Sequence, residues 1–198
     1  MYPSSIKNLI ESFKYLPGIG EKTAERMAFA VLNLDKDQVE SFASNMVEMK
    51  NNIHKCKICN NLTEDEVCNI CSNESRNKKS LVVVDDPKTV FVFENLGIYK
   101  GLYHVLDGLI SPIDGVNPED VGISQLVDRV NNGNFDEIIF AFKPSIEGET
   151  TALYIKRVLS GMNIKFSRLA SGVPMGADME YVDSLTLERA LSDRKEIE

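Results

Sequence analysis

Cys56-Lys-Ile-Cys59-Asn-Asn-Leu-Thr-Glu-Asp-Glu-Val-Cys68-Asn-Ile-Cys71 is the most informative stretch of this chain, because it holds every cysteine. Two Cys-x-x-Cys hooks stand eight residues apart. Each hook offers two thiolates across one tight turn, so the pair supplies the four ligands of a tetrahedral zinc site. Four thiolates complete that coordination, and we expect the nearby His54 to be a neighbour of the site. Two disulfides or four unrelated thiols are the alternatives, but nothing else in the chain indicates the secreted environment that disulfides need.

Composition and charge restrict the class of protein. The 198 residues are enough to bury a core, and 43% hydrophobic with 26% charged residues is ordinary for a globular protein. The N-terminus has no basic region followed by an apolar run, and no later apolar run approaches the length that spans a membrane. We therefore expect a cytoplasmic protein without a membrane partner.

The net charge of −8 is unevenly distributed. Residues 1–55 hold seven basic and seven acidic side chains, and residues 56–79 hold four of each. The acidic excess therefore falls in residues 80–198, with 11 basic and 19 acidic side chains. A polyanion is expected to meet the first half, whereas the second half suits a protein partner or a cation.

The N-terminal residues predict two short helices joined by a hairpin. Ser4 and Ser5 are expected to cap the first helix. Its apolar residues follow at helical spacing: Ile6, Leu9, Ile10 and Phe13. Leu16-Pro17-Gly18-Ile19-Gly20 ends it, because proline cannot continue a helix and glycine permits a tight turn. The second helix carries one apolar face: Ala24, Met27, Ala28, Val31 and Leu32. This is the helix-hairpin-helix pattern, which grips DNA backbones without reading sequence.

Four residues of this pattern are candidate DNA-binding residues: Gly18, Gly20, Lys22 and Arg26. Backbone N–H groups at the hairpin and at the start of the second helix form a seat for phosphate. Lys22 and Arg26 are four residues apart and project from one side of the helix. Contacts of this kind supply affinity but no base discrimination. An ordinary helical turn with solvated charges is the alternative, because two glutamates share the helix.

A third helix is predicted from Asp35, as its cap, to about Asn52. Its apolar residues are expected to form a core side: Val39, Phe42, Met46, Val47 and Met49. This helix leads the chain to the zinc loop.

Strands and helices alternate after a polar linker. The predicted strands are Leu81–Val84, Tyr103–Leu106, Ile138–Phe142 and Asn163–Leu169. The predicted helices run from Pro87 to about Asn95, onward from Asn117-Pro118, and from Glu149 to Leu159. Such alternation predicts an open, mostly parallel sheet with helices on both faces.

Acidic side chains follow two of these strands. Asp85 and Asp86 come after the first, and Glu147 and Glu149 after the third. Functional groups gather beyond the carboxyl ends of parallel strands, and carboxylates are the ligands that Mg²⁺ prefers. A Mg²⁺ site would be placed here.

Asp85-Asp86-Pro87 and Ala141-Phe-Lys-Pro-Ser-Ile-Glu-Gly-Glu149 resemble the Toprim fold of topoisomerases, primases and related nucleases. In the catalytic members a glutamate corresponds to Asp85, and a later Asp-x-Asp holds metal. This chain has Lys143 and Ser145 at those two aspartate positions. A cation and a hydroxyl in place of two anionic ligands would remove most of the affinity for Mg²⁺. The resemblance therefore implies a site that has lost its catalytic role.

The order of helix-hairpin-helix, four-cysteine loop and Toprim domain resembles the bacterial recombination mediator family RecR. Two further stretches match, Tyr103–Pro112 and Gly172–Tyr181, so the resemblance covers essentially the whole chain. It implies five parts: a DNA-binding region at 1–55, a C4-type zinc finger at 56–71, a linker at 72–79, a Toprim domain at 80–175, and a C-terminal oligomerisation arm at 176–198.

The resemblance implies a non-enzymatic factor of recombinational DNA repair, in the cytoplasm and associated with the nucleoid. Family members assemble as a ring-like tetramer around DNA. They act with RecO and RecF to help load RecA on single-stranded gaps coated by single-strand-binding protein. Lys22 and Arg26 would face the DNA, and the acidic Toprim surface of Asp85, Asp86, Glu147 and Glu149 would receive RecO.

The C-terminal stretch ends in a predicted helix capped by Ser184, with an apolar side: Leu185, Leu187, Ala190 and Leu191. The family suggests either a nucleotide site at Asp178, Glu180 and Asp183 or an arm that packs on a neighbouring subunit. The chain has no Gly-x-x-x-x-Gly-Lys-Ser/Thr loop to hold phosphates, which favours the arm.

Two other functions stay open on sequence alone. The chain could be a small metal-dependent Toprim nuclease that uses the four carboxylates after the strands. It could also be a zinc-stapled protein-interaction module with no DNA role.

Overall fold

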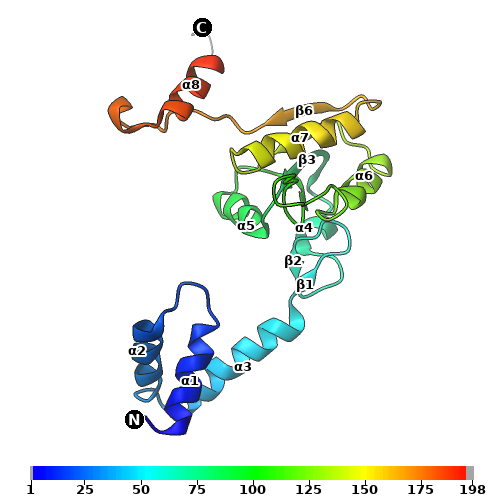
Figure 1. The fold of residues 1–198 in the computed structure, drawn as a ribbon. Coiled ribbons are helices and arrows are strands. Elements are labelled where there is room, and N and C mark those ends of the chain that lie inside the picture. Colours follow the sequence, from blue (N-terminus) through cyan, green and yellow to red (C-terminus); the bar gives the residue numbers. More distant parts are fainter. Residues whose placement is uncertain (1, 195–198) are drawn as a thin grey trace. The chain divides into compact units, whose positions relative to one another are not determined.

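The structure, a computed structural model, describes residues 2–194 (Figure 1). The chain forms two compact units, which divide between Ile53 and His54. Each unit has a hydrophobic core of its own.

The first unit is helical. Its elements are α1 (Ser4–Lys14), α2 (Glu21–Val31) and α3 (Lys36–Asn52). The two short helices bury a small core between them: Ile10, Phe13, Ala24 and Ala28. The predicted capping of α1 by Ser4 and Ser5 is wrong: both serines lie inside the helix, and Pro3 takes the cap position without a side-chain hydrogen bond. A proline there costs nothing, because the first N–H groups of a helix have no partner within it.

The third helix begins as predicted but packs differently. Asp35 and Gln38 form a capping box, with the Asp35 N–H donating to Gln38 Oε1 at 3.0 Å. The predicted core side is wrong, since no residue of α3 is buried. Four apolar side chains are 46 to 62% exposed: Phe42, Met46, Val47 and Met49. The small core of the unit is filled by α1 and α2, so α3 keeps an uncovered apolar side.

The second unit is built on a parallel sheet of four strands in the order β4-β3-β5-β6. The strands are β3 (Asn77–Val84), β4 (Gly101–Val105), β5 (Glu137–Phe140) and β6 (Lys165–Arg168). The last four residues of β3 and all five of β4 are buried, as expected for strands covered on both faces. Asn77, which was expected in the linker, already pairs with Gly101 and begins β3.

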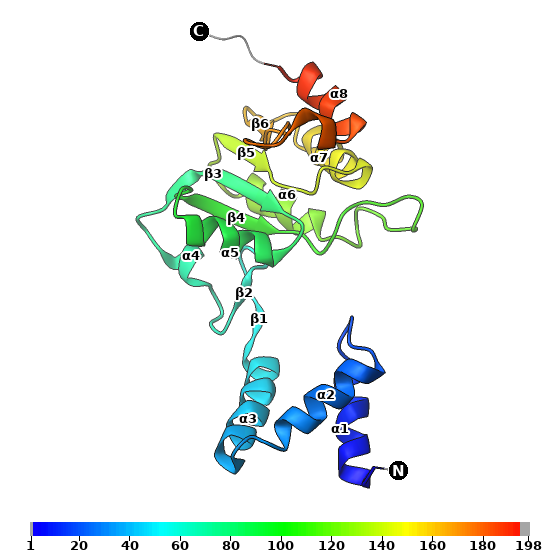
Figure 2. The same ribbon diagram turned by 90° about the vertical axis from the view of Figure 1, so that its left-hand side faces the viewer.

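Helices cover both faces of this sheet (Figures 1 and 2). They are α5 (Pro87–Leu96), α6 (Ile123–Asn131) and α7 (Ile146–Val158). The chain passes from β3 to β4 at one edge of the sheet. It then crosses back over β3 to β5 and continues in the same direction to β6 at the other edge. Because such crossovers are right-handed, α5 lies on one face and α6 and α7 on the other. The connections after β3 and β5 therefore diverge, and this is where parallel sheets place their sites.

Two of these helices begin elsewhere than predicted. The helix expected from Asn117 begins at Ile123, because the Asn117 N–H donates to Asp120 Oδ2 at 2.8 Å and closes a separate turn. The helix expected from Glu149 begins at Ile146, since Ser145 Oγ accepts from the Gly148 N–H at 3.2 Å and caps it.

The remaining elements flank the sheet. They are β1 (His54–Lys55), β2 (Leu62–Thr63), α4 (Asn69–Ser72), the 3₁₀ turn Met179–Tyr181 and α8 (Ser184–Ser192). The cap of α8 is Asp183, which accepts from Thr186 N–H at 2.9 Å, and not the predicted Ser184. Among the described residues, no helix has both the length and the apolar character to cross a membrane.

Candidate metal centre and nucleic-acid interface

The four cysteines converge on one point. Their sulfur atoms all lie within 4.8 Å of one another, and the Cys59 and Cys68 sulfurs are 3.6 Å apart. A zinc ion with four Zn–S bonds of about 2.3 Å needs sulfurs about 3.8 Å apart, so the site fits the metal. All four thiols are free of disulfides. The predicted zinc site is therefore confirmed, and the disulfide alternative is wrong.

Backbone geometry shapes the two hooks. The Cys56 N–H donates to the carbonyl of Asn61 at 2.8 Å, which closes the first turn. Asn60 occupies the left-handed region at φ +60°, which asparagine tolerates better than most residues. In the second hook the Cys68 N–H donates to the Cys56 sulfur at 3.3 Å. Hydrogen bonds within the first hook and between the two hooks therefore hold the cysteines close together.

The thiols of the cluster share hydrogen bonds with one another. Hydrogen bonds from Cys59 and then Cys71 lower the pKa of Cys68 to about 2, because they stabilise its thiolate. The same sharing raises the pKa of Cys59, since it is the proton donor. Three of the four cysteines are buried and Cys71 is half-buried. The four thiols are thus close enough to share protons, and zinc binds cysteines in their thiolate form.

Two histidines lie outside the sulfur cluster. His54 is exposed, and its Nε2 is 3.1 Å from the Asp65 carbonyl oxygen, in agreement with its prediction as a neighbour. His104 on β4 is 1% exposed and was not predicted as a site residue. Burial, and then the positive charge of Arg129, lower the pKa of His104 to about 3. His104 is therefore neutral at physiological pH.

The N-terminal hairpin presents the residues predicted to bind DNA. Gly18 has φ +82°, a conformation that other residues rarely adopt, and Gly20 caps α2. No side chain caps the N-terminus of α2, so its first N–H groups are available to a phosphate. The structure brings the hairpin and the helix start together as the sequence predicts.

Charges beside this hairpin are partly neutralised. Glu21 forms an ion pair with Lys14, whose amine is 2.7 Å away. Glu21 and then Glu11 raise the pKa of Lys14 through these contacts. Lys22 and Arg26, in contrast, are exposed and form no ion pair among the described residues. Their charges remain available to a polyanion.

The four acidic residues after β3 and β5 do not form one ion site. The only group of possible metal ligands within the described residues is the four cysteines. Asp86 caps α5 by accepting from the Lys88 N–H at 2.8 Å. Glu149 forms an ion pair with Arg168, whereas Glu147 is half-buried and forms no ion pair among the described residues. Burial raises the pKa of Asp85, against the opposing charge of Lys143.

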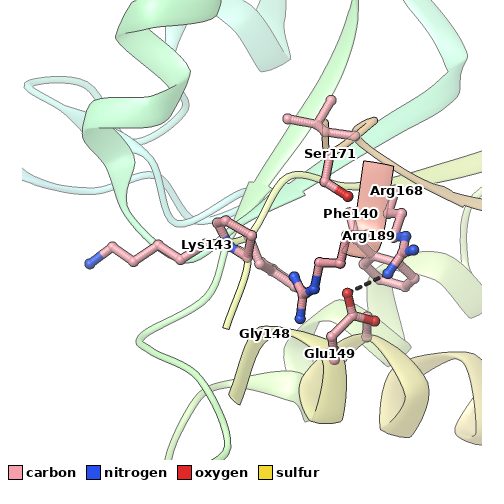
Figure 3. Close-up of a pocket in the computed structure, with 11 residues that line it drawn as sticks. Phe140, Lys143, Gly148, Glu149, Arg168, Ser171 and Arg189 are labelled. Atoms are coloured by element: carbon pink, nitrogen blue, oxygen red, sulfur yellow. Dashed lines mark hydrogen bonds and ion pairs between the residues drawn. The ribbon is translucent and has the colours of Figure 1, made fainter. Parts of the chain in front are cut away.

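Figure 3 shows the pocket beside these residues. The Lys143 side chain extends away from the Glu149–Arg168 pair, and Arg189 reaches into the pocket from α8. Arg168 also pairs with Asp193 at 2.9 Å, so it links α7 to the end of α8. Asp183, one of the suggested nucleotide-binding residues, is occupied as the helix cap, and its hydrogen bonds from Thr186 lower its pKa. Glu149, Arg168 and Asp193 are therefore engaged in ion pairs, and Asp183 is engaged in capping a helix.

Comparison with known families covers nearly the whole chain. Family models match for the RecR helix-hairpin-helix at residues 6–50, the RecR four-cysteine zinc finger domain at 53–73, the Toprim domain at 79–170 and the RecR C-terminal region at 172–195. The "Recombination protein RecR" of Lactobacillus helveticus is 45% identical over 194 residues, 98% of each chain. That of Staphylococcus aureus is 45% identical over 196 residues, 99% of each chain. With a zinc finger, a helix-hairpin-helix and a Toprim sheet all matched, the chain belongs to the RecR family of recombination proteins.

Proposed function

We propose that this protein is a DNA-binding mediator of recombinational repair with no catalytic activity of its own. The observation that carries the proposal is a contrast between two surfaces. Lys22 and Arg26 stand exposed and unpaired among the described residues beside an uncapped helix start. At the Toprim position, Lys143 and Ser145 replace metal ligands and Glu149 is held by Arg168. The described residues thus offer a means of holding DNA, but their carboxylates form no group that could hold the metal ion needed for cutting it.

The finer role follows the family resemblance. The protein would act with RecO and RecF to help load RecA on single-stranded gaps, in the cytoplasm at the chromosome. Backbone contacts carry no sequence information, which suits a factor that must act at any gap. The roles of the DNA-binding region at 1–55, the zinc finger at 56–71 and the C-terminal arm at 176–198 are part of this proposal, as are those of the individual site residues, with the sheet of the Toprim domain beginning at Asn77.

The uncovered side of α3 supports a homo-oligomer, either a dimer or a tetramer closed as a ring. Soluble proteins rarely expose a row of large apolar side chains unless a partner covers it. A second copy of the chain is the partner we propose here, since cyclic homo-oligomers are the commonest assemblies.

Replacing Phe42 and Met46 together by glutamate should break this contact. The glutamates would place like charges in a self-complementary apolar interface, and burying them unpaired is costly. Size-exclusion chromatography with light scattering should show the mass falling to that of a smaller species at micromolar concentration. The matched control Lys36→Glu with Lys50→Glu changes exposed charges on the same helix and should keep the wild-type mass. An unchanged mass for the Phe42 and Met46 variant would exclude this side as the interface.

The acidic end of the sheet supports a protein partner with basic residues, which we propose to be RecO. Glu147 is half-buried, and the side chain of Ile146 beside it is 78% exposed. A hydrogen bond from Ser145 lowers the pKa of Glu147, and the charge of Asp114 opposes this, so a second carboxylate lies near. Ile113, next to that aspartate, is 93% exposed. Exposed apolar groups beside carboxylates that form no ion pair among the described residues make a surface that suits a partner with apolar and cationic side chains.

The test of the proposal separates three functions. Zinc-loaded protein, Mg²⁺ and nicked, gapped and single-stranded DNA should give retention of every substrate in a gel-shift assay and cleavage of none. Reproducible cleavage that is lost on Glu147→Ala would instead establish the metal-dependent nuclease. Failure to retain any DNA at low salt would favour a protein-interaction module.

A further inference from the structure

Arg129 of α6 makes three polar contacts that converge on the zinc finger and β4. Its Nη2 lies 3.9 Å from the Cys71 sulfur. Its Nη1 donates to the Tyr103 carbonyl at 2.5 Å and lies 3.3 Å from Nδ1 of His104. We propose that Arg129 holds zinc in place from outside the coordination sphere, by balancing the charge of the thiolates and fastening the zinc loop to the sheet.

The charge of the bound zinc site needs compensation. Zinc bound by four thiolates carries a net charge of about −2, and a buried charge is costly unless donors or cations compensate it. Among the described residues, Arg129 is the one cationic side chain in contact with a ligand sulfur. Lys55 and Lys57 flank the first hook but are paired with Asp107 and Glu66. Arg129 is therefore the cation that remains for the site.

The shape of the Arg129 side chain also fits this role. The guanidinium is planar and offers five N–H donors in a fixed fork, which allows one side chain to bridge a sulfur and a carbonyl. Neutral His104 accepts at Nδ1, and this contact fixes the fork from a third direction. A lysine at this position would keep the charge but could not reproduce the fork.

The contacts of Arg129 join two segments that are distant in sequence, since Cys71 and Arg129 are 58 residues apart. Partners of this kind orient metal ligands and tune the affinity for the metal. A cavity of about 580 Å³, lined by Cys56, Asn60, Gln125 and Arg129 among others, borders the site. This cavity gives a chelator a route to the zinc finger. The rate at which a chelator removes zinc therefore reports how firmly the finger holds the metal.

The test compares three variants of the full-length zinc-loaded protein. Arg129→Met removes the charge and the fork, and Arg129→Lys removes the fork alone. Val130→Ala is the matched control, because Val130 is fully buried on the same helix and its apolar side chain cannot donate to a sulfur. Zinc release to 4-(2-pyridylazo)resorcinol should be about 10- to 100-fold faster for Arg129→Met than for the wild type. Arg129→Lys should be intermediate, and Val130→Ala should release zinc close to the wild-type rate.

A spectroscopic measurement separates an effect on the sulfur from general loosening. With Co²⁺ in place of zinc, the sulfur-to-cobalt charge-transfer band should shift in both Arg129 variants but not in Val130→Ala. Should Arg129→Met not fold, Arg129→Lys alone decides the question by the same two measurements. Wild-type release rates with an unmoved band in the Arg129 variants, or release no faster than in Val130→Ala, would overturn the proposal.

Discussion

Removing zinc, or replacing Cys59 by serine, is expected to lower the melting temperature of the second unit by more than about 10 °C. The N-terminal helices should remain folded. Three of the cysteines and Ile70 of the finger belong to the same buried cluster as β3 and β4. The Val105 N–H also donates to the Cys59 carbonyl at 2.8 Å. The zinc finger is therefore part of the core that supports β4, and its collapse would uncover that strand.

The magnitude follows from the energy of structural zinc. Binding contributes about 10–16 kcal/mol in zinc-finger peptides at pH 7. If only about 5 kcal/mol of this is coupled to the sheet, a unit of this size loses about 10–20 °C. The core of the first unit contains Ile10, Phe13, Ala24 and Ala28 and has no contribution from the finger.

Hydrogen exchange of the chelated protein should make this division visible. Protection should fall at Val105 and Leu106, and protection at Ala24 and Ala28 should not change. Adding zinc back should restore protection at Val105 and Leu106. The control Lys57→Ala, which changes an exposed residue of the same loop, should have little effect on protection. Equal loss of protection in both units would contradict the argument, because it would mean that the finger supports both cores.

The parts of the fold that the sequence predicts best are those with a local cause. Two cysteine hooks can converge on a metal without help from the rest of the chain, and the metal centre was predicted with all four of its ligands. The alternation of strands and helices after the finger predicted a parallel sheet, and buried runs such as Leu81–Val84 identified its strands. Asp35 was predicted as a cap from its type and place, and the capping box confirms it.

The errors arise where a neighbour outside the segment decides the outcome. The apolar side of α3 has the period of a core helix, but periodicity does not say whether the same chain covers it. At Asn117 a proline in the next position suggested a helix, whereas the Asp120 side chain closes a turn there. Arg129 was missed altogether, because no spacing rule links it to a cysteine 58 residues away. The four carboxylates were placed at the correct sheet edge, but their ion pairs and caps depend on Arg168 and on backbone groups that no motif includes.

Replacing Lys22 and Arg26 together by glutamate should weaken DNA binding about 100-fold in about 50 mM salt. Each phosphate contact releases about 0.9 counterion from duplex DNA, which at this salt concentration amounts to roughly tenfold in affinity per contact. Both side chains are exposed and unpaired within the described residues, so their charges are lost in full when they are replaced. Repulsion between the introduced carboxylates and the phosphates adds to the loss. The nearby Glu21 does not neutralise these two cations in the wild type, because it pairs with Lys14.

The salt dependence distinguishes a phosphate contact from a change in fold. The double variant Lys22→Ala with Arg26→Ala should make the plot of log binding constant against log salt concentration less steep, by the amount expected for the loss of about two phosphate contacts. The change in slope should be equal for unrelated DNA sequences. The control Lys36→Glu with Lys50→Glu alters the net charge of the same unit by the same amount as the hairpin charge reversal, away from the hairpin. It should lower affinity far less than the hairpin variant does. If the two charge reversals weakened binding equally, the general field of the unit would explain the affinity, and the hairpin would have no special part in it.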